Sequence, residues 1–138
     1  MKKLSALTIL IFSLFLSTDA FAECKNEDFS IFFERFKTDI PFSKERTKWP
    51  LLLTEQEFND SSKSKSKHIK SGADFWALKK SIPEFLNENK GIETSISEAN
   101  QKQVYVTFGI YDADILFDVS FIKKKGCWFL TEITQYER

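Results

Sequence analysis

The chain has 138 residues, and removal of a 22-residue export signal leaves 116, which is the size of a single domain. That length excludes a modular enzyme with separate binding and catalytic domains. The 20 Lys and Arg residues balance the 20 Asp and Glu residues, and the balance becomes 18 against 19 without the export signal. Because no excess of positive charge remains, we expect no binding to nucleic acid.

The N-terminus has the three parts of a secretory signal peptide. Lys2 and Lys3 precede an apolar run over residues 4–16, and Ala20-Phe21-Ala22 supplies the small residues that a signal peptidase requires. The run of about 13 apolar residues is shorter than the roughly 20 that cross a bilayer as a helix. We therefore expect cleavage after Ala22, a single domain over residues 23–138, a periplasmic or secreted location, and no stable membrane anchor.

Two cysteines, Cys24 and Cys127, lie near opposite ends of the exported chain. An oxidising compartment favours a disulfide between them. A catalytic thiol is the alternative, but it needs a basic partner, and the only histidine, His68, lies in a polar segment. A lipid anchor on Cys24 is disfavoured by Glu23, since a lipobox has a small residue there. The sequence thus predicts a Cys24–Cys127 disulfide.

Aromatic residues at the spacing i, i+3, i+4, i+7 predict the first helix, and they are Phe29, Phe32, Phe33 and Phe36. We expect Asn26 to cap this helix and Pro41 to end it. The resulting apolar stripe is typical of a core helix rather than of a ligand site. Pro50 predicts that the apolar segment around it is an edge strand or a connection.

The next segment, residues 54–73, is rich in charged and small side chains, with lysine and serine alternating over residues 61–67. We interpret it as a solvated loop or hairpin tip, with an anion-binding surface as the alternative. Residues 74–86 have helical spacing interrupted by Pro83, which favours two short helical pieces.

Four strands are predicted in the last third of the chain, over residues 92–97, 103–108, 115–121 and 129–133, because apolar and polar residues alternate there. A three-residue turn at 124–126, with Gly126 in the left-handed conformation, would pair Lys123 with Cys127. This register places Phe121 opposite Phe129 on one apolar face.

These elements predict an α+β domain in which N-terminal helices pack on a twisted four-strand antiparallel meander. Their order and proportions resemble the nuclear transport factor 2-like superfold, a cone-shaped, cystatin-related architecture. The resemblance implies a cavity between a curved sheet and its helices. Some enzymes of this superfold use an Asp in that cavity, and immunity proteins of this superfold cover a site on another protein.

A local motif resembles the opening signature of an uncharacterised family of secreted bacterial domains, written F-x-x-F-x-x-D-x-x-F-Q followed by R-x-x-F-P-L. The matching residues are Phe33, Phe36, Asp39, Phe42, Arg46, Pro50 and Leu51. The chain departs from the signature at Ser43, where Gln is usual, and at Trp49, where Phe is usual. The family has no established activity, so the resemblance implies a fold and a compartment.

One candidate catalytic pair follows from the predicted register, which places Asp118 opposite Glu132. Directly opposed like charges destabilise a strand pair, so a compensating feature is expected. Within a cavity, one carboxyl could keep its proton and act as an acid or base, with Tyr105 as a hydrogen-bond donor. On an exposed face the two carboxylates would point apart, and we favour this second interpretation.

A candidate binding patch combines Trp128 with Tyr111, Asp112 and Asp114, which offer aromatic and acidic anchors for a partner. We expect neither a metal site nor a cofactor, because the cysteines and the histidine have no ligand spacing and the glycines form no phosphate loop. The preferred prediction is a module that binds, inhibits or confers immunity to another exported protein. A small-molecule binder or cavity enzyme using Asp118 and Glu132 is the alternative.

Overall fold

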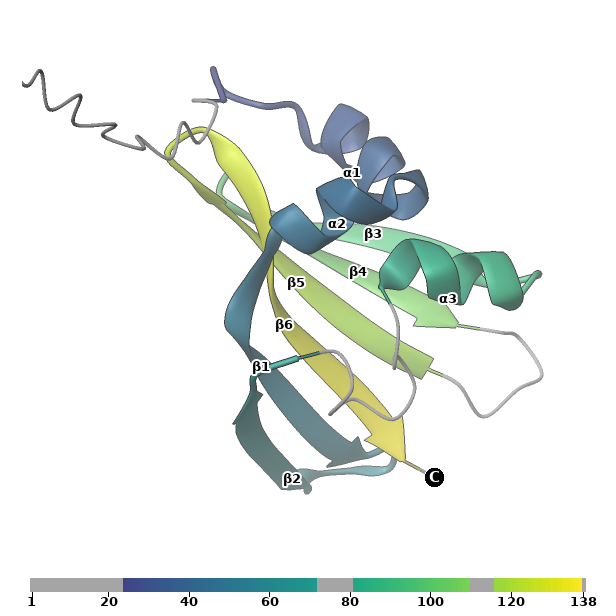
Figure 1. Cartoon of the computed structure of the whole chain (residues 1–138). Helices are drawn as coiled ribbons and strands as arrows, with labels where there is room; N and C mark the ends of the chain where they lie inside the picture. Colours follow the sequence, from purple (N-terminus) through teal and green to yellow (C-terminus); the bar gives the residue numbers. More distant parts are fainter. Residues whose placement is uncertain (1–23, 72–80, 110–115, 138) are drawn as a thin grey trace, which may run out of the picture.

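The computed structural model describes residues 24–71, 81–109 and 116–137, and the expected signal peptide lies outside these ranges (Figure 1). The elements in chain order are α1 (Phe29–Thr38), α2 (Ile40–Glu45), β1 (Thr47–Glu57), β2 (Asp60–Ile69), α3 (Ile82–Glu88), β3 (Glu93–Asn100), β4 (Gln103–Gly109), β5 (Leu116–Lys124) and β6 (Cys127–Glu137). Within these ranges no helix is both long and apolar enough to cross a membrane.

The described strands form one mixed sheet in the order β2-β1-β6-β5-β4-β3, and the helices lie on one side of it (Figure 1). The prediction of an α+β domain with N-terminal helices is confirmed. The predicted four-strand antiparallel meander is wrong as a description of the whole sheet. Strands β3 to β6 do pair antiparallel in succession, but β1 joins β6 in parallel and β2 pairs with β1.

The β1–β2 hairpin was predicted only in part, as an edge strand or connection around Pro50 and a solvated loop or hairpin tip over residues 54–73, because its sequence is unusual for strands. Three lysines on β2 alternate with serines, and their side chains are exposed at the edge of the sheet. Charged edge strands of this kind oppose pairing with other chains. Pro50 lies within β1, an interior strand, and not at an edge. The ladder tolerates it because the β1–β6 register is irregular between Thr47 and Leu52.

Two aspartates define the ends of the first helices. Asp28 rather than Asn26 caps α1, and its carboxylate accepts a hydrogen bond from the Ile31 N–H at 3.1 Å. Asn26 adopts a left-handed conformation with a φ of 52°. Asp39 is both the last cap of α1 and the first cap of α2. Pro41, which was expected to end α1, therefore lies in the first turn of α2.

The aromatic stripe of α1 packs on Phe121 of β5. All four of its phenylalanines are buried, and their ring centroids lie 5.1 to 5.9 Å from the centroid of Phe121. The prediction of a core role for the stripe is confirmed. Edge-to-face contacts of this kind add to the hydrophobic free energy of burial.

The turn between β5 and β6 corrects the predicted register. Lys124 pairs with Cys127, leaving a two-residue turn in which Lys125 and Gly126 have φ angles of 50° and 79°. Such turns match the right-handed twist of the flanking strands, which explains why this geometry replaces the predicted three-residue loop. A bulge beside Phe121 shifts the ladder again, so that Phe121 pairs with Leu130 and not with Phe129.

The predicted disulfide between Cys24 and Cys127 is confirmed, and it joins residues 103 positions apart. Replacement of both cysteines by serine should lower the free energy of unfolding by about 4–5 kcal/mol, because a cross-link over a loop of this length restricts the unfolded chain. Chemical denaturation of the oxidised protein and the double variant measures the difference. An unchanged midpoint would contradict the stabilising role of the disulfide.

Candidate functional site

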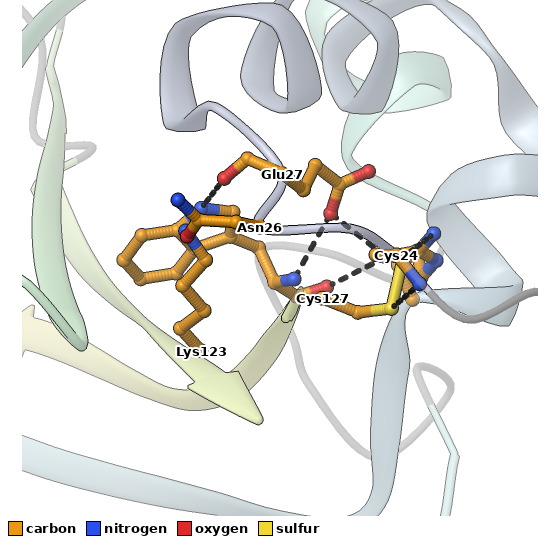
Figure 2. Close-up of a disulfide and its surroundings, with 7 residues drawn as sticks. Cys24, Asn26, Glu27, Lys123 and Cys127 are labelled. Carbon is orange, nitrogen blue, oxygen red and sulfur yellow. Dashed lines mark hydrogen bonds and ion pairs between the residues drawn. A yellow bond between two sulfur atoms is a disulfide. The ribbon is translucent and has the colours of Figure 1, made fainter. Parts of the chain in front are cut away.

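The segment that precedes α1 is fastened to the β5–β6 turn. The disulfide joins Cys24 to Cys127 (Figure 2), and in addition the Glu27 backbone N–H donates to the carbonyl oxygen of Gly126 at 2.8 Å. A Cβ atom at Gly126 would overlap the carbonyl oxygen of Cys24. Glycine is therefore required there by this close approach as well as by its positive φ angle.

A largely buried ion pair lies beneath this segment. The Arg46 Nη1 atom is 3.0 Å from Oε2 of Glu27, and the two side chains are 10% and 19% exposed. The same Oε2 atom accepts the Trp128 backbone N–H at 3.0 Å, while Arg46 also donates to the Trp128 carbonyl and to Sγ of Cys24. Each buried charge thus has several polar partners, as burial requires.

Trp128 belongs to this arrangement and to the core, so its predicted role as an exposed anchor is wrong. Its side chain is 3% exposed, its Nε1–H donates to the carbonyl of Glu27 at 2.9 Å, and its ring packs against Phe29. The corrected register places it on the helix side of the sheet. Its predicted companions Tyr111, Asp112 and Asp114 lie outside the described residues.

The predicted pair of Asp118 and Glu132 is not formed. Asp118 lies opposite Thr134, and Glu132 lies opposite Ser120, because the two-residue turn and the bulge shift the ladder. Tyr105 also pairs with Ser120, and its side chain donates no hydrogen bond to Asp118 in the part of the chain that the structure describes. The three residues therefore do not make an acid–base site.

Two hydroxyl groups bind the Asp118 carboxylate instead. Thr107 Oγ1 donates to one oxygen at 2.6 Å and the Tyr136 hydroxyl donates to the other at 2.6 Å. Burial, together with the hydrogen bond to Asp118 and its charge, raises the pKa of Tyr136 to about 12. Sequence reasoning missed Thr107 and Tyr136 because only the correct register places them beside Asp118.

A cleft of about 530 Å³ opens between the start of α1 and the β3–β4 turn. It is lined by Asn26, Glu27, Asp28, Phe29, Asn100, Gln101, Lys102, Val104, Lys123 and Trp128. The Lys123 Nζ atom donates to Oδ1 of Asn26 at 2.6 Å and lies 5.3 Å from the Trp128 ring centroid (Figure 2). The cleft volume falls within the range of small-ligand sites.

The face of the β5–β6 hairpin opposite Lys123 and Trp128 carries a second feature, which we call the basic–aromatic surface. It comprises Lys124, Lys125, Ile122 and Phe129 of the hairpin and Lys48 of β1. The Lys48 Nζ atom lies 4.9 Å from the Phe129 ring centroid, and Ile122, which pairs with Phe129, is 38% exposed. Partial burial and the neighbouring charges of Lys124 and Lys125 lower the pKa of Lys48. None of the three lysines has a carboxylate within ion-pair distance among the described residues.

Potential metal ligands are dispersed. In the described ranges, no three His, Cys, Asp or Glu side chains are close enough together to hold a metal ion. His68 is exposed on β2, opposite Leu52.

Replacing Glu27 with Gln should lower the free energy of unfolding by about 2–3 kcal/mol, since the Arg46 guanidinium would lose its counter-charge while remaining largely buried. Glu34→Gln is the matched control, because the Glu34 side chain is 72% exposed in its ion pair with Lys37. The control should cost less than about 1 kcal/mol. Equal effects in the two variants, measured by urea denaturation, would show that the buried pair has no special role.

The pKa of Tyr136 predicts a loss of stability at high pH. In the unfolded chain the phenol ionises near its ordinary pKa of 10.0, whereas in the folded protein it stays protonated up to about 12. The free energy of unfolding should therefore fall as the pH rises from 10 to 12, and fall less steeply in Tyr136→Phe. Tyr105→Phe controls for loss of a hydroxyl from the same face. Identical slopes in the wild type and Tyr136→Phe would refute this assignment.

Comparison with known proteins identifies the fold. No family model and no curated protein matches the chain. Among solved structures, it is similar to a nuclear transport factor 2-like protein from Bacteroides fragilis, with 19% identity, a TM-score of 0.56, and coverage of 82% of this chain and 48% of that one. The present chain thus spans about half the length of that relative.

Two further solved structures are similar over most of both chains. A protein from Bacteroides uniformis has 18% identity and a TM-score of 0.50, with 80% of this chain and 77% of that one covered. A cystatin-like protein from Bacteroides caccae has 17% identity and a TM-score of 0.50, with coverage of 79% and 76%. The chain therefore has the nuclear transport factor 2-like, cystatin-related fold that its sequence resembled.

Proposed function

We propose that this protein is an exported interaction module that binds the acidic surface of another exported protein through its basic–aromatic surface. The observation that carries the proposal is that Lys48, which lies over Phe129, has the charges of Lys124 and Lys125 beside it, and none of the three has a carboxylate partner in the described chain. Like charges held together in this way are costly alone and favourable beside a negatively charged partner.

The composition of the basic–aromatic surface suits a protein partner. Ile122 and the half-buried Phe129 give an apolar centre, and the lysines give a charged border. Protein interfaces commonly combine an apolar centre with a polar rim. A nucleic-acid partner is disfavoured by the balanced charge of the whole chain.

Export is supported by two independent features. The first 22 residues have the charge, apolar run and small residues of a signal peptide. Both cysteines of the chain are consumed in one disulfide, a bond that persists in oxidising compartments. A periplasmic or secreted partner follows from the same reasoning.

An inhibitory or immunity-type role is the form of binding that we favour. Asp118, the predicted acid or base, is held by two hydroxyl donors and does not pair with Glu132. A rigid surface on a disulfide-linked hairpin is suited to covering an acidic site on its partner, since little conformational freedom is lost on binding.

Affinity capture from periplasmic extract tests the proposal, with a Lys124→Glu/Lys125→Glu variant beside the wild type. The control is Lys65→Glu/Lys90→Glu, which makes the same change of charge on exposed residues away from the hairpin. The wild type and the control should retain an acidic protein at equal stoichiometry. Charge reversal on the hairpin should weaken its binding by tenfold or more, with a steep dependence on salt.

Two outcomes would contradict the proposal. Equal retention of the partner by both double variants would exclude the basic–aromatic surface as the binding site. Retention of a small molecule with no protein partner would exclude the interaction module itself and favour a small-molecule carrier.

A further inference from the structure

The cleft beside α1 shares no residue with the basic–aromatic surface, although both lie at the β5–β6 end of the sheet. Its walls come from three separate segments: the chain from Asn26 to Phe29, the β3–β4 turn, and the inner side of β5 and β6. The disulfide and the Glu27–Gly126 hydrogen bond hold the first wall in place. A cleft built in this way is preformed, which favours binding of a ligand.

Lys123 gives the cleft a charge without a counter-ion. Its ammonium group contacts the Asn26 amide oxygen and the face of Trp128, and no carboxylate of the described chain lies within ion-pair distance. The ammonium nitrogen itself lies over the indole ring, and this cation–π contact together with the Asn26 hydrogen bond positions the charge in the folded protein. Lys102 adds a second, exposed cation at the rim.

The two carboxylates that line the cleft already have partners. Glu27 binds Arg46 and the backbone of Trp128, and Asp28 caps α1 through the N–H of Ile31. Counting Lys102, Lys123 and Arg46 against Glu27 and Asp28 leaves three positive charges against two negative ones. The site therefore has a net charge of +1, and a single negative charge balances it.

Amide donors complete the site. The side-chain oxygen of Asn26 accepts from Lys123, and that of Asn100 accepts from the Lys102 backbone N–H at 2.8 Å. These bonds leave both NH₂ groups without a partner among the described residues, and both residues line the cleft. Ammonium and amide N–H groups together are the donors that a carboxylate accepts from.

We propose that the cleft binds a singly charged carboxylate, with Lys123 as its principal cation and Asn26 and Asn100 as hydrogen-bond donors. At pH 8, where inorganic phosphate is mainly a dianion, it binds less well, because the Glu27 and Asp28 carboxylates repel its second charge. The carboxylate comes either from a free organic acid or from an acidic side chain of a polypeptide. The proposal holds whether or not the basic–aromatic surface binds a protein.

Titration of the disulfide-bonded protein followed by NMR tests the proposal, with the Trp128 indole N–H and the Lys102 backbone N–H as reporters. The probes are acetate, inorganic phosphate, and two blocked peptides, acetyl-Gly-Glu-Gly-amide and acetyl-Gly-Gln-Gly-amide. Acetate should give saturable shifts at both reporters, phosphate should bind more weakly, and the Gln peptide should give none. Saturation by the Glu peptide identifies a polypeptide source, whereas saturation by acetate alone identifies a free acid.

Variants locate the binding to the cleft. Lys123→Met removes the ammonium group but keeps an unbranched side chain of similar length, and it should weaken acetate binding about tenfold, the equivalent of one charged hydrogen bond. Lys102→Met, at the exposed rim, should weaken it by a smaller factor, and Lys65→Met on β2 should have no effect. The spectra themselves report whether each variant is folded.

Three results would overturn the assignment. These are the absence of saturable shifts with any carboxylate at millimolar concentration, equal affinity of Lys123→Met and the wild type, and tighter binding of phosphate than of acetate.

Discussion

The rest of the structure depends on the ion pair between Arg46 and Glu27, because it joins three parts of the domain: the start of α1, the α2–β1 connection and β6. Glu27 lies just before α1, Arg46 lies between α2 and β1, and both contact the backbone of Trp128 on β6. Two charges are largely removed from water here, and each is satisfied by more than one partner. The helices, the first strand and the β5–β6 hairpin are thereby fixed relative to one another.

Both candidate binding features follow from this junction. With the N-terminal segment linked to the hairpin, the side chains of Asn26 and Lys123 meet (Figure 2), and both residues line the cleft. The other side of the hairpin presents Lys124 and Phe129 to an approaching partner. One rigid element thus carries two surfaces of different chemistry, a recessed one for which we propose a single carboxylate and an open one for which we propose a larger acidic partner.

Local patterns predicted most of the elements and the antiparallel succession of β3 to β6, but not the register between β5 and β6 or the pairing of β1 and β2. The spacing of the α1 phenylalanines and the alternation in β3 to β6 each depend on a few neighbouring residues, and both were predicted correctly. The register between β5 and β6 depends on whether the turn at Gly126 has two or three residues and on a bulge beside Phe121. A shift of this kind changes which residues share a face. It moved Trp128 into the core and separated Asp118 from Glu132.

The β1–β2 hairpin and the motif near α2 are two further regions whose structure the sequence predicted incompletely. Alternating lysine and serine on β2 have the period of a strand, but their polarity resembles that of a loop, and only pairing with β1 distinguishes the two. The core positions of Phe33 and Phe36 were expected from the helical stripe, whereas the sequence did not specify that Asp39 caps α2 or that Arg46 binds Glu27. These motif residues thus have structural roles in the described chain.

Native-state hydrogen exchange tests the central claim, that α1 and the β5–β6 hairpin are held together as one cooperative unit. Amides of α1, such as those of Phe32 and Phe36, should open with the same free energy and the same denaturant dependence as amides of β5 and β6. If the α1 amides exchange through a separate opening of lower free energy while the hairpin stays protected, the junction at Arg46 and Glu27 does not unite them, and the account is wrong.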